Sequence, residues 1–207
     1  MKKNNQLELI KRIKSLSDAG LIYAQNEYEK ERYKELRSIS IRLLGIVSNE
    51  PFSSLNDFFM PNKDYPTPKV DIRGFVLNKT KEILLVKEKM DGKWSLPGGW
   101  ADIGFSPIEV INKEIIEETG LSSIVLRLLA IYDKKCHPHP PQPFYVYKLV
   151  FLCEILSGEI NTSFDIEEAR YFNIRSLPEL SEDRILKYQI EQLYQKTING
   201  DQTVYFD

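Results

Sequence analysis

The chain has 207 residues, of which 42% are hydrophobic and 28% are charged, and its formal net charge at pH 7 is −2. This length accommodates one domain of ordinary size and a small additional module. At this near-neutral net charge, the chain lacks the excess of basic residues that is typical of a dedicated nucleic-acid binder. The sequence has no run of about 18 apolar residues, so we expect no membrane-spanning helix.

Residues 4–48 have the apolar spacing of helices. The first apolar side chains recur every three or four positions, at Leu7, Ile10, Ile13 and Leu16. This spacing predicts an amphipathic helix rather than a signal peptide. The segment 17–20 resembles a helix stop, and a second helix is predicted over about residues 21–47.

The segment 62–68, NKDYPTP, contains two prolines and is the best candidate linker. It predicts a small N-terminal helical domain over residues 1–62 and a second domain over residues 68–207. In the second domain the apolar pattern changes to the shorter period of strands, which we predict at 70–77, 83–86, 121–132, 144–156 and 169–174. The first two of these strands are predicted to form a hairpin.

Helices of the second domain are predicted over residues 106–119, 177–180 and 185–197. Strands with helices interspersed predict an α/β fold, in which a mixed sheet carries helices on its faces. The two cysteines, Cys136 and Cys153, lack the spacing of metal ligands or of a disulfide framework. We therefore expect free thiols and a cytoplasmic protein.

The predicted helix 106–119 carries three glutamates, Glu114, Glu117 and Glu118, whose spacing places them on one face. Three carboxylates on one face repel one another unless a cation or solvent screens them. Carboxylate oxygens suit Mg²⁺ or Mn²⁺, and Mg²⁺ is commonly shared with substrate phosphates. Alone, this pattern also fits a solvated acidic face, but the glycine pair at 98–99 allows a close backbone approach nearby.

The segment GGWADIGFSPIEVINKEIIEETGL, residues 98–121, resembles the Nudix box, G-x5-E-x7-R-E-U-x-E-E-x-G-U, where U is a bulky aliphatic residue. Read from Gly99, the segment matches without a gap at Glu114, Ile115, Glu117, Glu118, Gly120 and Leu121. Two positions depart from the box, since Phe105 replaces its first glutamate and Lys113 replaces its arginine. Lysine keeps the charge but lacks the bidentate geometry of arginine.

The resemblance implies a Nudix α/β/α sandwich with a mixed sheet, preceded here by the small helical domain. It implies Mg²⁺ or Mn²⁺ ions held by the Gly98 carbonyl and by Glu114, Glu117 and Glu118. An acidic residue from a later loop often joins such a site, and Glu168 is the first choice here. A metal-activated water would attack one phosphorus of a P–O–P bridge, with Glu114, Glu118 and Glu168 as catalytic carboxylates and Glu118 or Glu168 as the base.

The phrases VDIRGFVL, GKWSLPGGWADIG and HPPQPFYVYKLVFLCE are similar to a Gram-positive Nudix group with an added N-terminal helical domain. Characterised members resemble CDP-choline pyrophosphatases, which implies hydrolysis of CDP-choline to CMP and phosphocholine. ADP-ribose or another nucleoside diphosphate-X compound is the alternative substrate, and RNA, cut from its 3′ end, is an implied secondary one. A nucleotide sensor that does not cut its ligand is the alternative from a different class.

Choline is a quaternary ammonium, and aromatic faces bind such cations. Candidate substrate-binding residues are therefore Trp100 and Phe105, in the segment of the box, and Phe144 and Tyr145, beyond the proline-rich loop. Each of them also suits a core or interface position. Arg73, in the predicted strand 70–77, is a candidate contact for a phosphate or a base.

The two predicted N-terminal helices are too small to bury much apolar surface by themselves. They need a partner surface, either on the same chain or on another one. Nudix enzymes of this type are commonly homodimers, so we expect a homodimer with the N-terminal domain in its interface.

Overall fold

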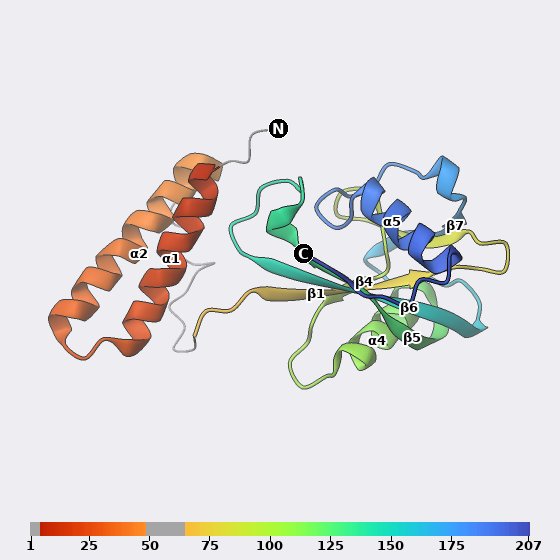
Figure 1. Ribbon diagram of the computed structural model, residues 1–207, viewed down its shortest axis with the longest axis horizontal. Helices are drawn as coiled ribbons and strands as arrows, with labels where there is room; N and C mark the ends of the chain where they lie inside the picture. Colours follow the sequence, from red (N-terminus) through yellow and green to blue (C-terminus); the bar gives the residue numbers. More distant parts are fainter. Residues whose placement is uncertain (1–4, 49–64) are drawn as a thin grey trace. The chain divides into compact units, whose positions relative to one another are not determined.

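The computed structural model describes residues 5–48 and 65–207, so the expected linker at 62–68 lies partly outside the described residues. The chain forms two compact units. The first contains the N-terminal helices together with Pro141–Tyr145, and the second contains Lys69–Pro140 and Val146–Asp207. Figure 1 shows the elements of both units in chain order.

The first unit is an antiparallel pair of helices, α1 (Asn5–Tyr23) and α2 (Glu27–Ser48). The predicted stop at 17–20 was wrong, because α1 continues through Gly20. A Cβ atom at Gly20 would lie 2.3 Å from Cε1 of Tyr33. This glycine therefore serves the close approach of α2 rather than the end of α1, and the break comes at 24–26.

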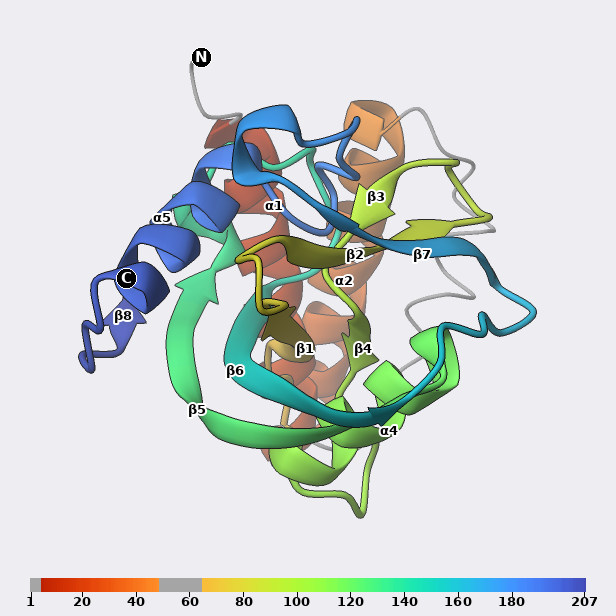
Figure 2. The ribbon, with the colours of Figure 1, turned by 90° about the vertical axis from the view of Figure 1, so that its right-hand side faces the viewer.

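The second unit contains a five-stranded sheet of order β4-β1-β6-β5-β8 and a three-stranded sheet of order β3-β2-β7. The strands are β1 (Lys69–Val76), β2 (Ile83–Glu88), β3 (Trp94–Ser95), β4 (Gly98–Trp100), β5 (Leu121–Asp133), β6 (Val146–Gly158), β7 (Ile166–Phe172) and β8 (Tyr205–Phe206). Strand β1 is parallel to β6 and antiparallel to β4, which confirms a mixed sheet. Strands β5 and β6 form a long curved ribbon (Figure 2).

The predicted hairpin of strands 70–77 and 83–86 was wrong. Strands β1 and β2 belong to different sheets, and an isolated antiparallel bridge between Leu77 and Ile83 joins their ends. The predicted helix at 177–180 was also wrong, since the short 3₁₀ turn nearby is Ile174–Ser176. A second 3₁₀ turn, Lys134–Cys136, follows β5.

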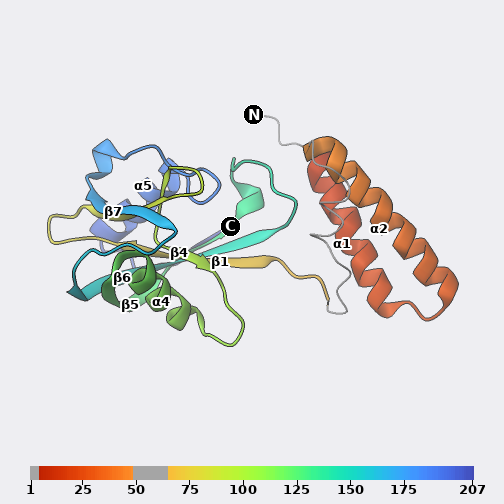
Figure 3. The same ribbon diagram turned by 180° about the vertical axis from the view of Figure 1, so that it is seen from behind.

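Helices α4 (Pro107–Thr119) and α5 (Lys187–Ile198) lie on opposite sides of the larger sheet (Figures 1 and 3). One core lies under α4, and its fully buried members include Ile72, Val76, Leu84, Ile111 and Ile115. The other lies between the sheets and α5, and includes Phe75, Leu85, Tyr132, Val150 and Ile190. The α/β sandwich with an N-terminal helical region is thus confirmed. Among the described helices none is long and apolar enough to cross a membrane.

Candidate active site

Helix α4 has capping interactions at both ends. Ser106 and Glu109 form a capping box, in which the Glu109 carboxylate accepts a hydrogen bond from Ser106 N at 2.7 Å. Pro107 occupies the first turn, and Gly120 ends the helix with a left-handed φ of 74°. These caps fix the limits of the helix and therefore which of its side chains face the sheet.

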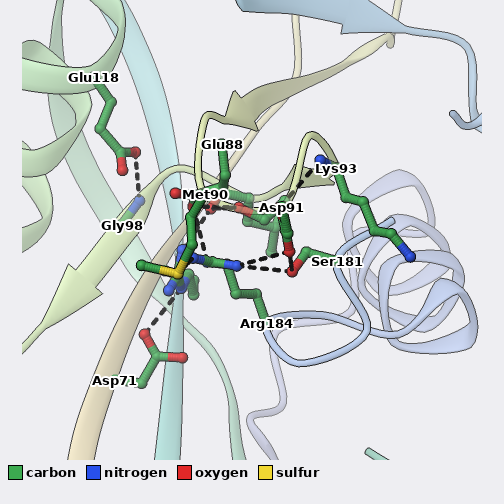
Figure 4. A network of polar contacts seen from close by, with 12 residues as sticks. Asp71, Glu88, Met90, Asp91, Lys93, Gly98, Glu118, Ser181 and Arg184 are labelled. Atoms are coloured by element: carbon green, nitrogen blue, oxygen red, sulfur yellow. Dashed lines mark hydrogen bonds and ion pairs between the residues drawn. The ribbon is translucent and has the colours of Figure 1, made fainter. Parts of the chain in front are cut away.

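Two of the three glutamates, Glu114 and Glu118, lie one helical turn apart and face Gly98 and Gly99 of β4. Glu118 is 7% exposed, and its Oε2 accepts a hydrogen bond from Gly98 N at 2.8 Å (Figure 4). A Cβ atom at Gly99 would lie 2.8 Å from Glu114 Oε1. At Gly98, φ is 135° and a Cβ atom would lie 2.1 Å from the Ile72 carbonyl oxygen. Gly99 therefore leaves room for the Glu114 carboxylate beside β4, and Gly98 allows the close approach of β4 to β1.

The electrostatic environment of Glu118 disfavours its ionised form. Burial raises the pKa of Glu118 to about 8. Arg73 and the Gly98 N–H act in the opposite direction, because both stabilise the carboxylate. The neighbouring carboxylates of Glu114 and Glu88 add to the upward shift. A bound cation would stabilise the ionised form of Glu118.

The pKa of Glu114 is shifted in the same direction. Burial raises it, and the nearby charges of Glu117 and Asp102 add to that shift. Glu117 is exposed on the same helix. Within residues 5–48 and 65–207, no three His, Cys, Asp or Glu side chains converge as a complete metal cluster. The donor chemistry nevertheless fits a hard divalent ion, because the carboxylates of Glu114 and Glu118 converge on the same two glycines at the start of β4.

Two family models match this chain, one over its N-terminal part and one over most of the remainder. A family model described as a UDP-X-like, N-terminal oligomerisation domain matches residues 4–59. A model of the NUDIX domain matches residues 67–193, which is more than half of the chain. The chain belongs to the Nudix hydrolase family. This membership confirms the prediction of an enzyme.

Some relatives of this Nudix enzyme match nearly its full length, and others match part of it. YjhB of Bacillus subtilis, provisionally named an ADP-ribose pyrophosphatase, is 39% identical over 97% of this chain and 96% of its own. An ADP-ribose pyrophosphatase of Methanocaldococcus jannaschii is 34% identical over 58% of this chain and 70% of its own. The crystal structure of a UDP-X diphosphatase has a TM-score of 0.64 and 34% identity, and covers 100% of both chains.

Arg73 lies in β1 beside the Nudix box, where its backbone pairs with Gly98. It is 6% exposed, its Nε lies 2.9 Å from Asp71 Oδ1, and its Nη1 donates to the Leu96 carbonyl at 3.0 Å. Burial acts to lower the pKa of Arg73, but the carboxylates around it raise it overall. Arg73 is thus an internal charge of the site, and its contact with substrate stays a prediction.

Glu168, the predicted additional acid, lies in β7 opposite Lys87 of β2. Its carboxylate is 44% exposed, and its Oε1 lies 3.4 Å from Arg170 Nε. Arg170 in turn stacks on the ring of Phe172 at 4.6 Å. The ion pair of the Glu168 side chain is therefore with its own strand, and its role as a base stays a prediction.

The four candidate aromatic residues lie in two different units. Trp100 and Phe105 lie within the segment of the Nudix box and are 48% and 51% exposed. Each ring has a lysine over it, with Lys69 Nζ at 5.3 Å from the Trp100 centroid and Lys113 Nζ at 5.5 Å from that of Phe105. The other two, Phe144 and Tyr145, belong to the first unit.

The surroundings of Tyr145 are those of a structural contact. Its hydroxyl donates to the Glu8 carbonyl at 3.3 Å, and Lys11 Nζ lies 4.1 Å from its ring centroid. The segment Pro141–Tyr145 is thereby joined to helix α1. The contact of Tyr145 with substrate stays a prediction.

Three further residues near the site were missed by the sequence reasoning, namely Asp71, Glu88 and Arg184. Asp71 forms ion pairs with Arg73 and Lys148, and is 5% exposed. Its alternation with Arg73, two charged residues at inward positions of β1, was an available signal. The other two residues are far apart in the sequence, so no local pattern connects them.

Proposed function

We propose that this Nudix enzyme is a divalent-metal-dependent pyrophosphatase that hydrolyses the P–O–P bond of nucleoside diphosphate-X compounds. One observation carries the proposal: two carboxylates of α4, Glu114 and Glu118, converge on Gly98 and Gly99 of β4. The names of the relatives support the same class, since they include ADP-ribose pyrophosphatases and a UDP-X diphosphatase.

The proposed mechanism assigns a task to each residue of the site. A divalent ion, Mg²⁺ or Mn²⁺, would neutralise phosphate charge and lower the pKa of a water. Glu114, Glu117, Glu118 and the Gly98 carbonyl would hold that ion. Glu118 or Glu168 would take the proton of the attacking water. The water oxygen then bonds to one phosphorus, the bridging oxygen leaves with the other, and the products are two monophosphates.

We propose CDP-choline as the foremost substrate, cleaved to CMP and phosphocholine. The rings of Trp100 and Phe105 support it, because each already has a lysine cation over its face. ADP-ribose and UDP-linked compounds are the substrates that the relatives favour. RNA, cleaved by the same phosphate chemistry, is the proposed secondary substrate.

The proposed assembly is a homodimer formed through the N-terminal helices. The family model for this part is described as an oligomerisation domain. Apolar side chains stay exposed along both helices, at Leu9, Ile13 and Leu16 of α1 and at Leu36, Ile39, Leu43 and Ile46 of α2. Their spacing of three and four residues makes a stripe on each helix, as a helical interface requires. A cytoplasmic location fits the two free cysteines.

The substrate test uses the purified chain with Mg²⁺ and, separately, CDP-choline, ADP-ribose, a UDP-sugar and a short RNA. The reaction runs in ¹⁸O water, and mass spectrometry identifies the products and the labelled phosphate. Fastest release of CMP and phosphocholine is expected. Faster cleavage of ADP-ribose or the UDP-sugar would keep the reaction and replace the substrate. No cleavage of any compound would contradict the proposed function.

A further inference from the structure

The 3₁₀ turn Lys134–Cys136, which follows β5, is held at both ends by one carboxylate oxygen. Asp207 Oδ2 accepts a hydrogen bond at 2.8 Å from Asp133 N, before the turn, and lies 2.7 Å from His137 Nε2, after it. The other ring nitrogen of His137 contacts the hydroxyl of Tyr188. The backbone that carries Lys134 is therefore fixed within the second unit.

Lys134 is an almost buried cation whose hydrogen-bonding capacity is unused. It is 8% exposed, and its Nζ makes no hydrogen bond to any of the described residues. It forms an ion pair with Asp183, but the Oδ1 of that residue lies 3.9 Å away, beyond hydrogen-bonding distance. A lysine ammonium has three donors, and a buried charge without hydrogen bonds is unfavourable. An anion within hydrogen-bonding distance would therefore stabilise the charged form of Lys134.

The charges around Lys134 also favour an anion. Lys148 lies on β6, the strand beside this turn, opposite Asp71 of β1. Asp71 is already shared between Lys148 and Arg73. Burial, followed by the charge of Lys148, lowers the pKa of Lys134 to about 8, and the carboxylates of Asp183 and Asp71 oppose this shift only in part. Among the described residues, the three cations thus form ion pairs with two carboxylates.

The turn lies apart from the proposed site of the divalent cation. In the larger sheet, strands β1 and β6 separate β4, which carries Gly98, from β5. Neighbouring strands are about 4.8 Å apart, so three spacings put about 14 Å between β4 and β5. An anion at Lys134 is therefore distinct from the phosphates that the cation would bind. A nucleoside diphosphate-X compound has groups on both sides of its diphosphate, and either side can carry a further phosphate or a carboxylate.

We propose that Lys134 forms a second subsite, which binds an anionic group that the substrate carries outside its scissile diphosphate. The ammonium would donate charge-assisted hydrogen bonds to a phosphate or a carboxylate there. This inference rests on the proposed function, because the anion belongs to a nucleoside diphosphate-X substrate. CDP-choline has no such group, so its binding does not use Lys134. The subsite adds a further class of substrate, namely nucleoside diphosphate-X compounds with an additional anion.

The test uses two pairs of compounds that differ by one anionic group: ADP-ribose 2′-phosphate with ADP-ribose, and UDP-glucuronate with UDP-glucose. Titration calorimetry in EDTA measures the affinity for each compound without divalent ions, and kinetics with Mg²⁺ measure KM. Lys134→Gln removes the charge, and Lys134→Arg keeps it. Lys135→Gln is the matched control, because Lys135 Nζ in the same turn also lies 3.9 Å from a carboxylate oxygen, that of Asp133, but its side chain is 44% exposed.

We expect the wild type to bind the compound with the additional anion about tenfold more tightly than its counterpart in at least one pair. Lys134→Gln should lose this preference, whereas Lys134→Arg and Lys135→Gln should keep it. KM for CDP-choline should stay the same in all three variants. A preference in the ADP-ribose pair alone would assign Lys134 to a phosphate on the nucleoside, and a preference in the UDP pair alone would assign it to a carboxylate on the X group.

Three results would overturn the inference without touching the proposed function. They are equal affinities within both pairs for the wild type, a preference that persists in Lys134→Gln, and an equal loss of the preference in Lys135→Gln. The first of these needs no variant, so it applies even if Lys134→Gln fails to fold. A wild type that shows the preference in EDTA but cleaves no compound with Mg²⁺ would overturn the proposed function and keep the anion subsite.

Discussion

Lys113 Nζ lies 3.0 Å from Asp102 Oδ2, and the same ammonium lies 5.5 Å from the centroid of the Phe105 ring. The two residues that depart from the Nudix box, Phe105 and Lys113, are therefore in contact with each other. Asp102, three residues before Phe105, supplies a carboxylate to the lysine. The hydrogen bond to Asp102, followed by the charge of Glu117, raises the pKa of Lys113. At the two positions that depart from the box, the ring of Phe105 and the ammonium of Lys113 thus contact each other, and the Asp102 carboxylate balances the charge of the ammonium.

Asp102→Asn removes this ion pair and keeps the side-chain shape. Because the partners are 38% and 52% exposed, we expect a small loss of kcat/KM, about two- to fivefold, with an unchanged Tm. Glu191→Gln is the control, since its ion pair with Lys187 on α5 is exposed and distant from the box. A loss on the order of a hundredfold would mean that Asp102 acts on the metal or substrate directly.

Glu118→Gln removes one carboxylate charge from the proposed cation site. The glutamine amide oxygen can still accept the hydrogen bond from Gly98 N, so the fold should remain intact. We expect kcat to fall by about 10²- to 10³-fold. Steady-state kinetics and a thermal unfolding curve measure the two quantities. Wild-type kcat in this variant would show that the site is misassigned.

The local signals of α4 made it the most predictable element. Ser106, Pro107 and Gly120 act within a few residues, so the predicted helix 106–119 differs from the observed one by a single residue at its start. Strand pairing is not local in this way. Strand β1 was predicted to pair with the next strand, but its parallel partner β6 begins at Val146. The sequence indicates a turn at 78–80. Which of the two sheets a strand joins, however, depends on how its side chains pack in the core.

The site shows the same division between local and distant contacts. The Nudix box identified Glu114 and Glu118 from the sequence because both lie on one helix. Glu88 and Arg184 come from different parts of the second unit, and neither belongs to a spacing pattern. Their ion pair depends on the packing of the β2–β3 turn against the segment 181–184. Such a contact is found only after the chain has folded.

The proposed choline contact can be tested at Trp100. If its ring holds the quaternary ammonium, Trp100→Ala should raise KM for CDP-choline by about five- to thirtyfold and leave KM for ADP-ribose nearly unchanged. Lys69, whose ammonium lies over this ring, provides the matched variant Lys69→Gln. Removing it should not weaken CDP-choline binding, since the lysine cation competes with choline for this ring. Equal effects of Trp100→Ala on both substrates would contradict the cage.

The proposed dimer depends on the exposed stripe of α2. Ile39 is 45% exposed, and Ile39→Glu places a charge within that stripe. We expect light scattering to show a dimer for the wild type and a monomer for this variant, because a buried unpaired charge is unfavourable. Lys34→Glu, at an exposed position of α2 off the stripe, should remain a dimer. A monomeric wild-type protein would refute the assembly.

The buried carboxylate of Asp71 should be essential for stability, because Arg73 and Lys148 both depend on it. Asp71→Asn leaves two buried cations without this partner, and we expect the free energy of unfolding at pH 7 to fall by about 3–5 kcal/mol. Urea denaturation measures this loss. Glu167→Gln is the control, because its ion pair with Lys87 is partly exposed and should contribute less than about 1 kcal/mol.

The contribution of Asp71 should also depend on pH in one direction. Burial alone would raise the pKa of Asp71, but Arg73 and Lys148 together hold it below its ordinary value of 3.8. The folded state therefore binds this proton less readily than the unfolded chain does, and the stabilisation is present above pH 3.8. It is lost as the pH falls through the lowered pKa, so the difference between wild type and Asp71→Asn should shrink in that range. A difference that stayed constant from neutral pH into that acidic range would mean that Asp71 contributes through shape rather than charge.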